Sequence, residues 1–417
     1  MLTAVGFLIL YGGLCLLSVC KHPVFGLAAY FAAFFLHPPD RWWGILLPDI
    51  RWSLLAALVS LLSVVIHKNT LPRKPAFVSQ PACVLFLLFL IYLGLQFAWT
   101  MSMENQERLF VLYFKYFILI YLIYRILDSE AFLRVFLWSI VAGGFILGWI
   151  AFQDYTGGRF EGFGGAGVGD SNTGGATLVF CGLTAGSLFL ATGWRERAAL
   201  LLCGVFIVNG IVTTQSRSAF LALGVSAFAF YALAPSHHRN ILRLLTLAGL
   251  AGFLLLTNPY YWARMASIEK AAVEGNSKTD YSAGRIVLMN AQLKMAKDLN
   301  FLGGGHRATA LLSPQYLDDR YLTGKGEHRA RSSHNTYLSL LVEHGIPGLG
   351  LWLLLDLWIF FAVYKLWRRL RWNVSSAWVL PQEQPRPSCW RGRFERCEKV
   401  AIQSKQMTSS RPSCRPC

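Results

Sequence analysis

Long apolar runs recur along most of the chain, and they constrain its fold more than any other feature. Two examples are CVLFLLFLIYLGLQFAW, which begins at Cys83, and GLGLWLLLDLWIFFAVY, which begins at Gly348. Each approaches the roughly 20 residues that a helix needs to cross a bilayer. Backbone groups in the bilayer core must be paired within the protein, and runs this long without alternation are typical of helices rather than barrel strands. The sequence therefore predicts an all-α, polytopic membrane protein.

The hydropathy pattern predicts about eleven membrane segments. They cover roughly residues 2–20, 23–37, 52–67, 81–99, 109–127, 132–151, 174–192, 196–213, 218–234, 240–257 and 346–366. The charged fraction of 15% agrees with this, because a soluble domain carries about a quarter charged residues. The second segment is short and ends at Pro38–Pro39, so a tilted or interfacial element is the alternative there.

The net charge of +17 is distributed in a way that indicates membrane orientation rather than nucleic-acid binding. Basic residues gather in or beside the gaps after odd-numbered segments, at Lys68–Lys74, Arg195–Arg197, His237–Arg243 and Lys365–Arg371. The gaps after the fourth and sixth segments are net acidic. We therefore expect the N-terminus outside, the even-numbered gaps outside and the C-terminal tail in the cytoplasm.

This topology divides the chain into four regions. They are membrane helices 1–10 over residues 1–257, an outward loop over 258–345, the last membrane helix over 346–366, and a basic tail over 367–417. The tail composition predicts disorder. Within the loop, a helix is expected from Ser282 to about Leu299, with an apolar face of Ile286, Met289, Leu293 and Ala296 that packs on the membrane domain or lies in the interface. A second helix is expected from Ser333 through Glu343.

Three polar stretches fall on the predicted outer side. They are Thr213–Ser218, Gly284–Arg285, and Ser332–Tyr337 followed by Glu343–Gly348. Taken singly, each has a structural explanation: an arginine that snorkels to the interface, a solvated surface arginine, and a histidine that neighbours a helix cap. Together, Arg217, Arg285 and His334 predict an anion site with a base, because arginine matches phosphate oxygens and imidazole accepts a proton near neutral pH.

These stretches resemble a known family. QSRSAFLALG, GRIVLMNAQLKMAKDLNFLGGG and SSHNTYLSLLVEHGIPGLGLWLLL look like three signature regions of the O-antigen ligase/polymerase superfamily. The segment Arg159–Gly162, followed by Asp170–Asn172, is similar to a further region. The resemblance covers about residues 80–366, and its most specific part is the HN-x-YL…E-x-G-x-x-G pattern that begins at His334.

The resemblance implies a metal-independent, inverting glycosyltransferase without a cofactor. Such an enzyme takes a glycan from undecaprenyl pyrophosphate at the periplasmic face of the bacterial inner membrane and joins it to lipid A–core or another acceptor. The two essential arginines and the histidine of the family map onto Arg217, Arg285 and His334. The outer loop has adjacent carboxylates at Asp318–Asp319 and no Asp-x-Asp, which agrees with the absence of a divalent ion.

We also expect four residues to contact substrate. Arg159 is a candidate third phosphate contact, Lys115 lies within a predicted membrane segment near the outer phosphate site, and Asn172 and Asn335 adjoin the motifs. The alternative for Lys115 is a structural ion pair with Asp356.

Three other functions remain open. A repeat-unit polymerase and a protein O-oligosaccharyltransferase would use the same donor with a different acceptor. A transporter of lipid-linked glycan would show inverted repeats and charges near the midplane, and no repeat is found in the sequence.

Overall fold

The computed structural model of the protein describes residues 2–165, 168–234, 239–256, 281–322, 330–333 and 335–377. The described part of the chain is helical and contains no strand. The predicted all-α class is therefore confirmed. The chain divides into two units, 1–362 and 363–417, and the described residues of the second unit are helical.

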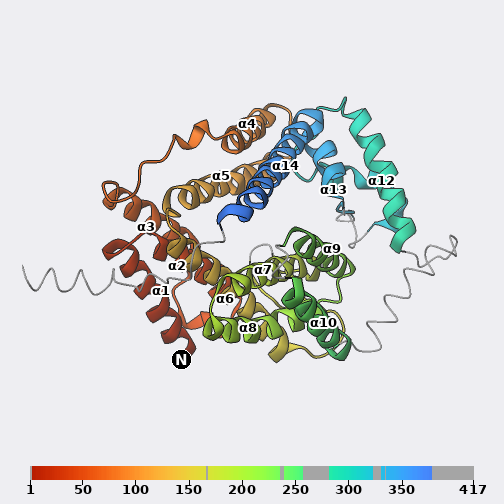
Figure 1. Cartoon of the computed structure of the whole chain (residues 1–417). Helices are drawn as coiled ribbons and strands as arrows, with labels where there is room; N and C mark the ends of the chain where they lie inside the picture. Colours follow the sequence, from red (N-terminus) through yellow and green to blue (C-terminus); the bar gives the residue numbers. More distant parts are fainter. Residues whose placement is uncertain are drawn as a thin grey trace, which may run out of the picture. The chain divides into compact units, whose positions relative to one another are not determined.

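The helices are labelled in Figure 1. They are α1 (Leu2–Cys20), α2 (Val24–Leu36), α3 (Trp52–Ile66), α4 (Pro81–Leu95), α5 (Met103–Ile126), α6 (Glu130–Asp154), α7 (Ser171–Ala191), α8 (Trp194–Thr213), α9 (Arg217–Leu233), α10 (Arg239–Leu256), α12 (Tyr281–Asp298), α13 (Ala308–Tyr316) and α14 (Thr336–Ala377). Short 3-10 turns lie at η1 (Pro38–Asp40), η2 (Gly44–Leu46), η3 (Phe77–Ser79), η4 (Gln96–Ala98) and η6 (Asp319–Tyr321).

Seven of the described helices are long and apolar enough to cross a membrane. They are α1, α4 extended through η4, α5, α6, α7, α8, and α14 as far as Arg369. The predicted count of about eleven is not confirmed, since α3 and α9 are apolar but have 15 and 17 residues. The second predicted segment, α2, has 13 residues and ends at Leu36; His37, which follows, has a left-handed backbone and precedes two prolines.

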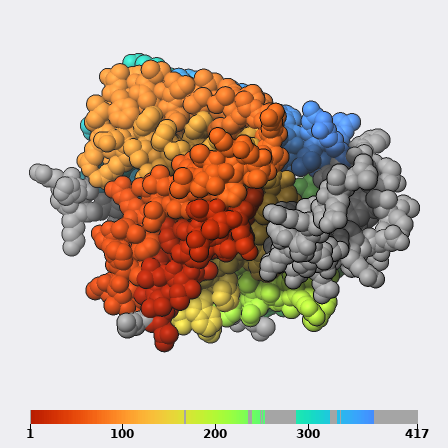
Figure 2. All heavy atoms as spheres, turned by 90° about the vertical axis from the view of Figure 1, so that its left-hand side faces the viewer, coloured from red at the N-terminus to blue at the C-terminus, as the bar shows by residue number. Residues whose placement is uncertain are grey.

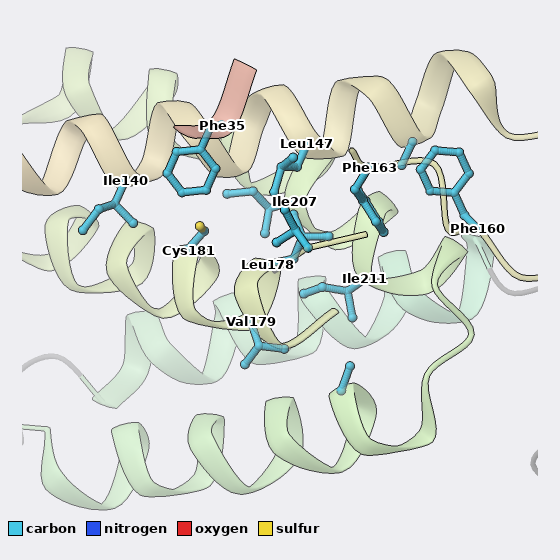
Figure 3. Close-up of a cluster of buried hydrophobic side chains, with 13 residues drawn as sticks. Phe35, Ile140, Leu147, Phe160, Phe163, Leu178, Val179, Cys181, Ile207 and Ile211 are labelled. Carbon is cyan, nitrogen blue, oxygen red and sulfur yellow. The ribbon is translucent and has the colours of Figure 1, made fainter. Parts of the chain in front are cut away.

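Helices α6, α7 and α8 form a packed core, which Figure 3 shows in close-up. Gly148 permits a close approach of α6 to α8, because a Cβ atom there would lie 2.1 Å from the carbonyl oxygen of Phe206. The loop after α6 folds back onto this core, where Phe160 and Phe163 are buried with Leu178 of α7. The core thereby holds the loop that carries Arg159.

The N-terminal half of α14 packs on two helical pairs. Leu340 lies in a cluster with Phe89 of α4 and Leu109 of α5. Val342 lies in a cluster with Met295 of α12 and other apolar residues of α12 and α13. The start of α14 is thus fixed within the first unit by contacts with helices distant in the sequence.

Both helices that were predicted within the loop 258–345 are present, but their ends and the buried face of the first one differ from the prediction. Helix α12 begins one residue before the predicted Ser282, but Ile286, Met289 and Leu293 are exposed. The buried face instead holds Leu288, Ala291 and Met295. The prediction that the first face packs on the membrane domain is therefore wrong, except for Ala296, which is buried. The adjacent face is buried because it contacts α13 and α14. The interfacial alternative is compatible with the exposed residues.

The predicted break after Glu343 is present as a kink in a longer helix. Gly345 has φ 63° and ψ −168° inside α14, followed by Pro347. The helix continues to Ala377, beyond the predicted end of the membrane segment at residue 366, so residues 367–377 are helical rather than disordered. The rest of the predicted tail, 378–417, lies outside the described residues.

Candidate functional site

The turn between α8 and α9 presents Arg217 at a helix N-terminus. Thr214, Gln215 and Ser216 are buried, and Gln215 has a left-handed backbone with φ 47°. The Ser216 hydroxyl caps α9 by accepting a hydrogen bond from the Ala219 N–H at 3.3 Å. Arg217 is therefore the first residue of the helix, half-buried at the positive end of the helix dipole.

The loop before α7 is bonded to this turn. The Phe160 N–H donates to the carbonyl oxygen of Thr213 at 3.0 Å. Next to it, the Nε atom of Arg159 lies 3.4 Å from Oε1 of Glu161, which also accepts a hydrogen bond from the Ser171 hydroxyl at 3.2 Å. The guanidinium of Arg159 is thus held near the start of α7.

The first turn of α7 completes the arrangement. Asp170 caps the helix by accepting hydrogen bonds from the N–H groups of Asn172 and Thr173, at 2.8 and 3.1 Å. Burial raises the pKa of the Asp170 carboxyl, but hydrogen bonds from Thr173 and Asn172 and the charge of Arg159 lower it, so its pKa lies below the ordinary value. The carboxyl therefore stays ionised.

A side-chain bond joins the starts of α7 and α9. The Ser216 hydroxyl donates to Oδ1 of Asn172 at 2.8 Å. The helices approach closely at Gly175, where a Cβ atom would lie 2.7 Å from Cβ of Ala219. We call the residues Arg159, Glu161, Asp170–Asn172 and Ser216–Arg217 the arginine cluster. Two helix N-termini and two arginines in one hydrogen-bonded group suit the binding of an anion.

Lys115 does not form the structural ion pair with Asp356 that was the alternative to a substrate contact. Among the ion pairs of the described residues, none joins Lys115 to Asp356. Lys115 is exposed on α5 and lines a groove beside α2 and α3.

The remaining predicted residues lie at α12 and at the start of α14. Oδ1 of Asn335 accepts hydrogen bonds from the N–H groups of Tyr337 and Leu338 at 3.0 and 3.1 Å, so Asn335 caps α14. Arg285 lies in the first turns of α12, and its side chain is outside the described part. His334 is outside the described residues, and the roles of both residues stay predictions.

A second polar cluster was not predicted as a unit. The glycine loop, Gly303–Gly305, lies against α14, where the Gly305 N–H donates to the carbonyl oxygen of Glu343 at 2.8 Å. Nδ1 of His306 lies 2.9 Å from a carboxylate oxygen of Glu343, and Nδ1 of buried His344 lies 2.6 Å from Oε1 of Gln96. The three consecutive glycines were a signal for such a close approach.

Within the described ranges, no group of three or more His, Cys, Asp or Glu residues could hold a metal ion. Metal independence remains a prediction from the resemblance.

The fold and the arginine cluster define a multi-pass, helical membrane protein with a polar, arginine-containing site at two helix N-termini. Residues 198–353 match the family model described as O-antigen ligase, which confirms the predicted resemblance to the O-antigen ligase-like superfamily. The match contains Arg217, Arg285 and His334, whereas Arg159, Asn172 and Lys115 precede it. No curated protein and no solved structure matches the chain. The family implies glycosyltransferase activity with a lipid-linked glycan and an acceptor.

Proposed function

We propose that the protein transfers a glycan from undecaprenyl pyrophosphate to lipid A–core, as an O-antigen ligase. The observation that carries the proposal is the arginine cluster, in which the turn with Arg217, inside the family match, is bonded to the start of α7 beside Arg159. Guanidinium groups beside helix N-termini suit a pyrophosphate leaving group, whose charge grows as the glycosidic bond breaks.

The proposed reaction is a single inverting displacement. The acceptor hydroxyl oxygen attacks the anomeric carbon from the face opposite the pyrophosphate, and the carbon–oxygen bond to the pyrophosphate breaks. His334 takes the proton of the hydroxyl. Arg217 and Arg285 bind the departing pyrophosphate, with Arg159 as a third contact. These steps need no metal ion and no cofactor.

We place this chemistry on the periplasmic side of a bacterial inner membrane, with residues 258–345 outside and the tail in the cytoplasm. The charges of the short gaps support this orientation. Gln315 in α13 is exposed, so a Gln315→Cys variant should react with an impermeant thiol reagent once the outer membrane is permeabilised. An Arg195→Cys variant is the control and should require permeabilisation of the inner membrane. The reverse pattern would contradict the topology.

Arg217→Lys is expected to reduce transfer by at least about tenfold, which corresponds to about 1.4 kcal/mol in the barrier. Lysine keeps the positive charge but loses the planar fork that binds two phosphate oxygens. The measurement is glycan transfer by purified protein. Arg195→Lys is a matched control, because Arg195 is exposed at the start of α8, whereas the turn with Arg217 follows the end of α8. Equal activity of both variants would remove Arg217 from the proposed site.

The acceptor separates ligase from polymerase and protein transferase, since all three share the donor. A deletion strain should accumulate long lipid-linked polymer and carry uncapped lipid A–core. Single-repeat caps on the core would indicate a polymerase, and loss of glycan from protein alone would indicate a protein transferase.

A further inference from the structure

A groove of about 390 Å³ lies between α2, α3 and α5. Its floor is apolar and includes Ala57, Leu58 and Leu61 of α3 and Ile118 and Leu119 of α5. Figure 2 views the molecule from the side on which the N-terminal helices lie. A volume of this size is within the range of small-molecule sites in proteins, which is roughly 300–1,000 Å³.

Two cations line the groove. Lys115 lies near the middle of α5, and Arg51 directly precedes α3. Within the described part of the chain, neither forms an ion pair. Asp49 also lines the groove, so the cations exceed the carboxylates by one. A lysine within a spanning helix is costly and usually has a partner, and the groove therefore suits an anion attached to an apolar chain.

The rim of the groove is bonded to the loop that carries Arg159. His37 and Pro38 belong to this rim, and Nδ1 of His37 lies 3.0 Å from a carboxylate oxygen of Asp40. The same oxygen of Asp40 accepts a hydrogen bond from the Gly165 N–H at 2.6 Å. Arg41 donates to the carbonyl oxygen of Phe163 at 2.6 Å. These contacts join the segment at the rim, residues 37–41, to the loop between α6 and α7 that also carries Arg159.

We propose that this groove binds the donor lipid, with one long isoprenoid chain on the apolar floor and the lipid-side phosphate facing Arg51 and Lys115, so that the glycan-side phosphate is left for the arginine cluster. The inference rests on the proposed function, because it assigns the lipid part of the same donor. A groove of about 390 Å³ with two cations suits one chain and a phosphate better than the several acyl chains of a lipid A acceptor. The rim contacts explain how a lipid seated here would have its headgroup next to the loop with Arg159.

A second groove provides an internal control. It has a volume of about 570 Å³ and is lined by residues of α1, α2 and α6, together with Glu196 of α8. Its cation, Arg134, forms ion pairs with Glu130 and Glu196, at 3.2 and 3.6 Å. Arg134 thus faces two carboxylates, so this group of side chains carries a net negative charge and the second groove should not select a phosphate.

The test uses the full chain in nanodiscs of zwitterionic phospholipid, with a polyprenyl phosphate that carries a photoreactive group in its chain. Crosslinks are expected on α3 and α5. Ala57→Trp places a large side chain in the α2–α3–α5 groove, and Lys115→Met removes a cation from an exposed position. Each variant should raise the Kd for the polyprenyl phosphate by at least about tenfold. Ala32→Trp, in the second groove, should leave the Kd unchanged.

Three results would overturn the inference: crosslinks confined to other helices, an unchanged Kd in both groove variants, or equal competition by phosphatidylglycerol, which would indicate a general phospholipid site. Binding of the polyprenyl phosphate is measured without acceptor. A failure to bind in the groove is therefore distinguishable from a failure to transfer glycan. Binding in the groove without any transfer by the wild type would contradict only the proposed function. Unchanged donor KM and transfer in monodisperse Ala57→Trp protein would contradict only the groove.

Discussion

Replacing His334 with alanine is expected to reduce the turnover of glycan transfer by about 10²–10⁴-fold, the usual effect of removing a general base. Donor binding should stay close to that of the wild type, because the base acts on the transition state rather than on the bound donor. The measurement is turnover by purified protein, together with donor affinity in the absence of acceptor.

His334→Asn distinguishes a base from a residue that only neighbours a helix cap. The cap of α14 is already provided by Asn335, whose side-chain oxygen accepts two backbone hydrogen bonds. A second asparagine is well tolerated near a helix start, so folding should be preserved. Near-normal turnover by His334→Asn would exclude His334 from the chemistry.

Gly345→Ala is expected to destabilise the protein by about 3 kcal/mol or more, which combines backbone strain with overpacking. The φ of 63° and ψ of −168° fall in a region that is essentially restricted to glycine. A Cβ atom would lie 2.2 Å from the carbonyl oxygen of Phe301 and 2.5 Å from the carbonyl carbon of Leu302. Both are backbone atoms, so relief requires movement of the glycine loop away from α14.

Thermal unfolding and size-exclusion profiles in detergent measure this effect. Gly350→Ala is the matched control, because Gly350 lies in the same helix and its added Cβ would meet nothing within 4 Å. The control should be as stable as the wild type. Equal stability of the two variants would show that the kink at Gly345 does not hold the loop.

The sequence predicted which segments are helical, but it did not predict which faces of the helices pack together. The apolar runs predicted the helical class, and Gly345 with Pro347 predicted the break in α14. The packed face of α12 was misassigned because Leu288 and Met295 contact α13 and α14, which a periodicity argument does not locate. Several predicted membrane segments are shorter as helices than as apolar runs, as in α2, where Pro38 and Pro39 follow the helix end.

Parts of the candidate site depend on contacts between distant residues. The Ser216–Asn172 bond spans 44 residues, and the contact between the His306 N–H and Gln106 spans 200. A single sequence contains no local signal for either pairing. The motif around Arg217 was visible as a short polar stretch between two apolar segments. The E-x-G-x-x-G pattern gave no indication that Glu343 and Gly345 contact the glycine loop.

The proposed activity is glycan transfer from a lipid pyrophosphate by the chain's own side chains. Its most direct test incubates the purified, full-length protein with an undecaprenyl-pyrophosphate glycan and lipid A–core, in EDTA and without added metal. We expect the glycan to appear on the core with inverted anomeric configuration, at the same rate with and without EDTA. Strict dependence on a divalent ion, or retention of configuration, would contradict the account.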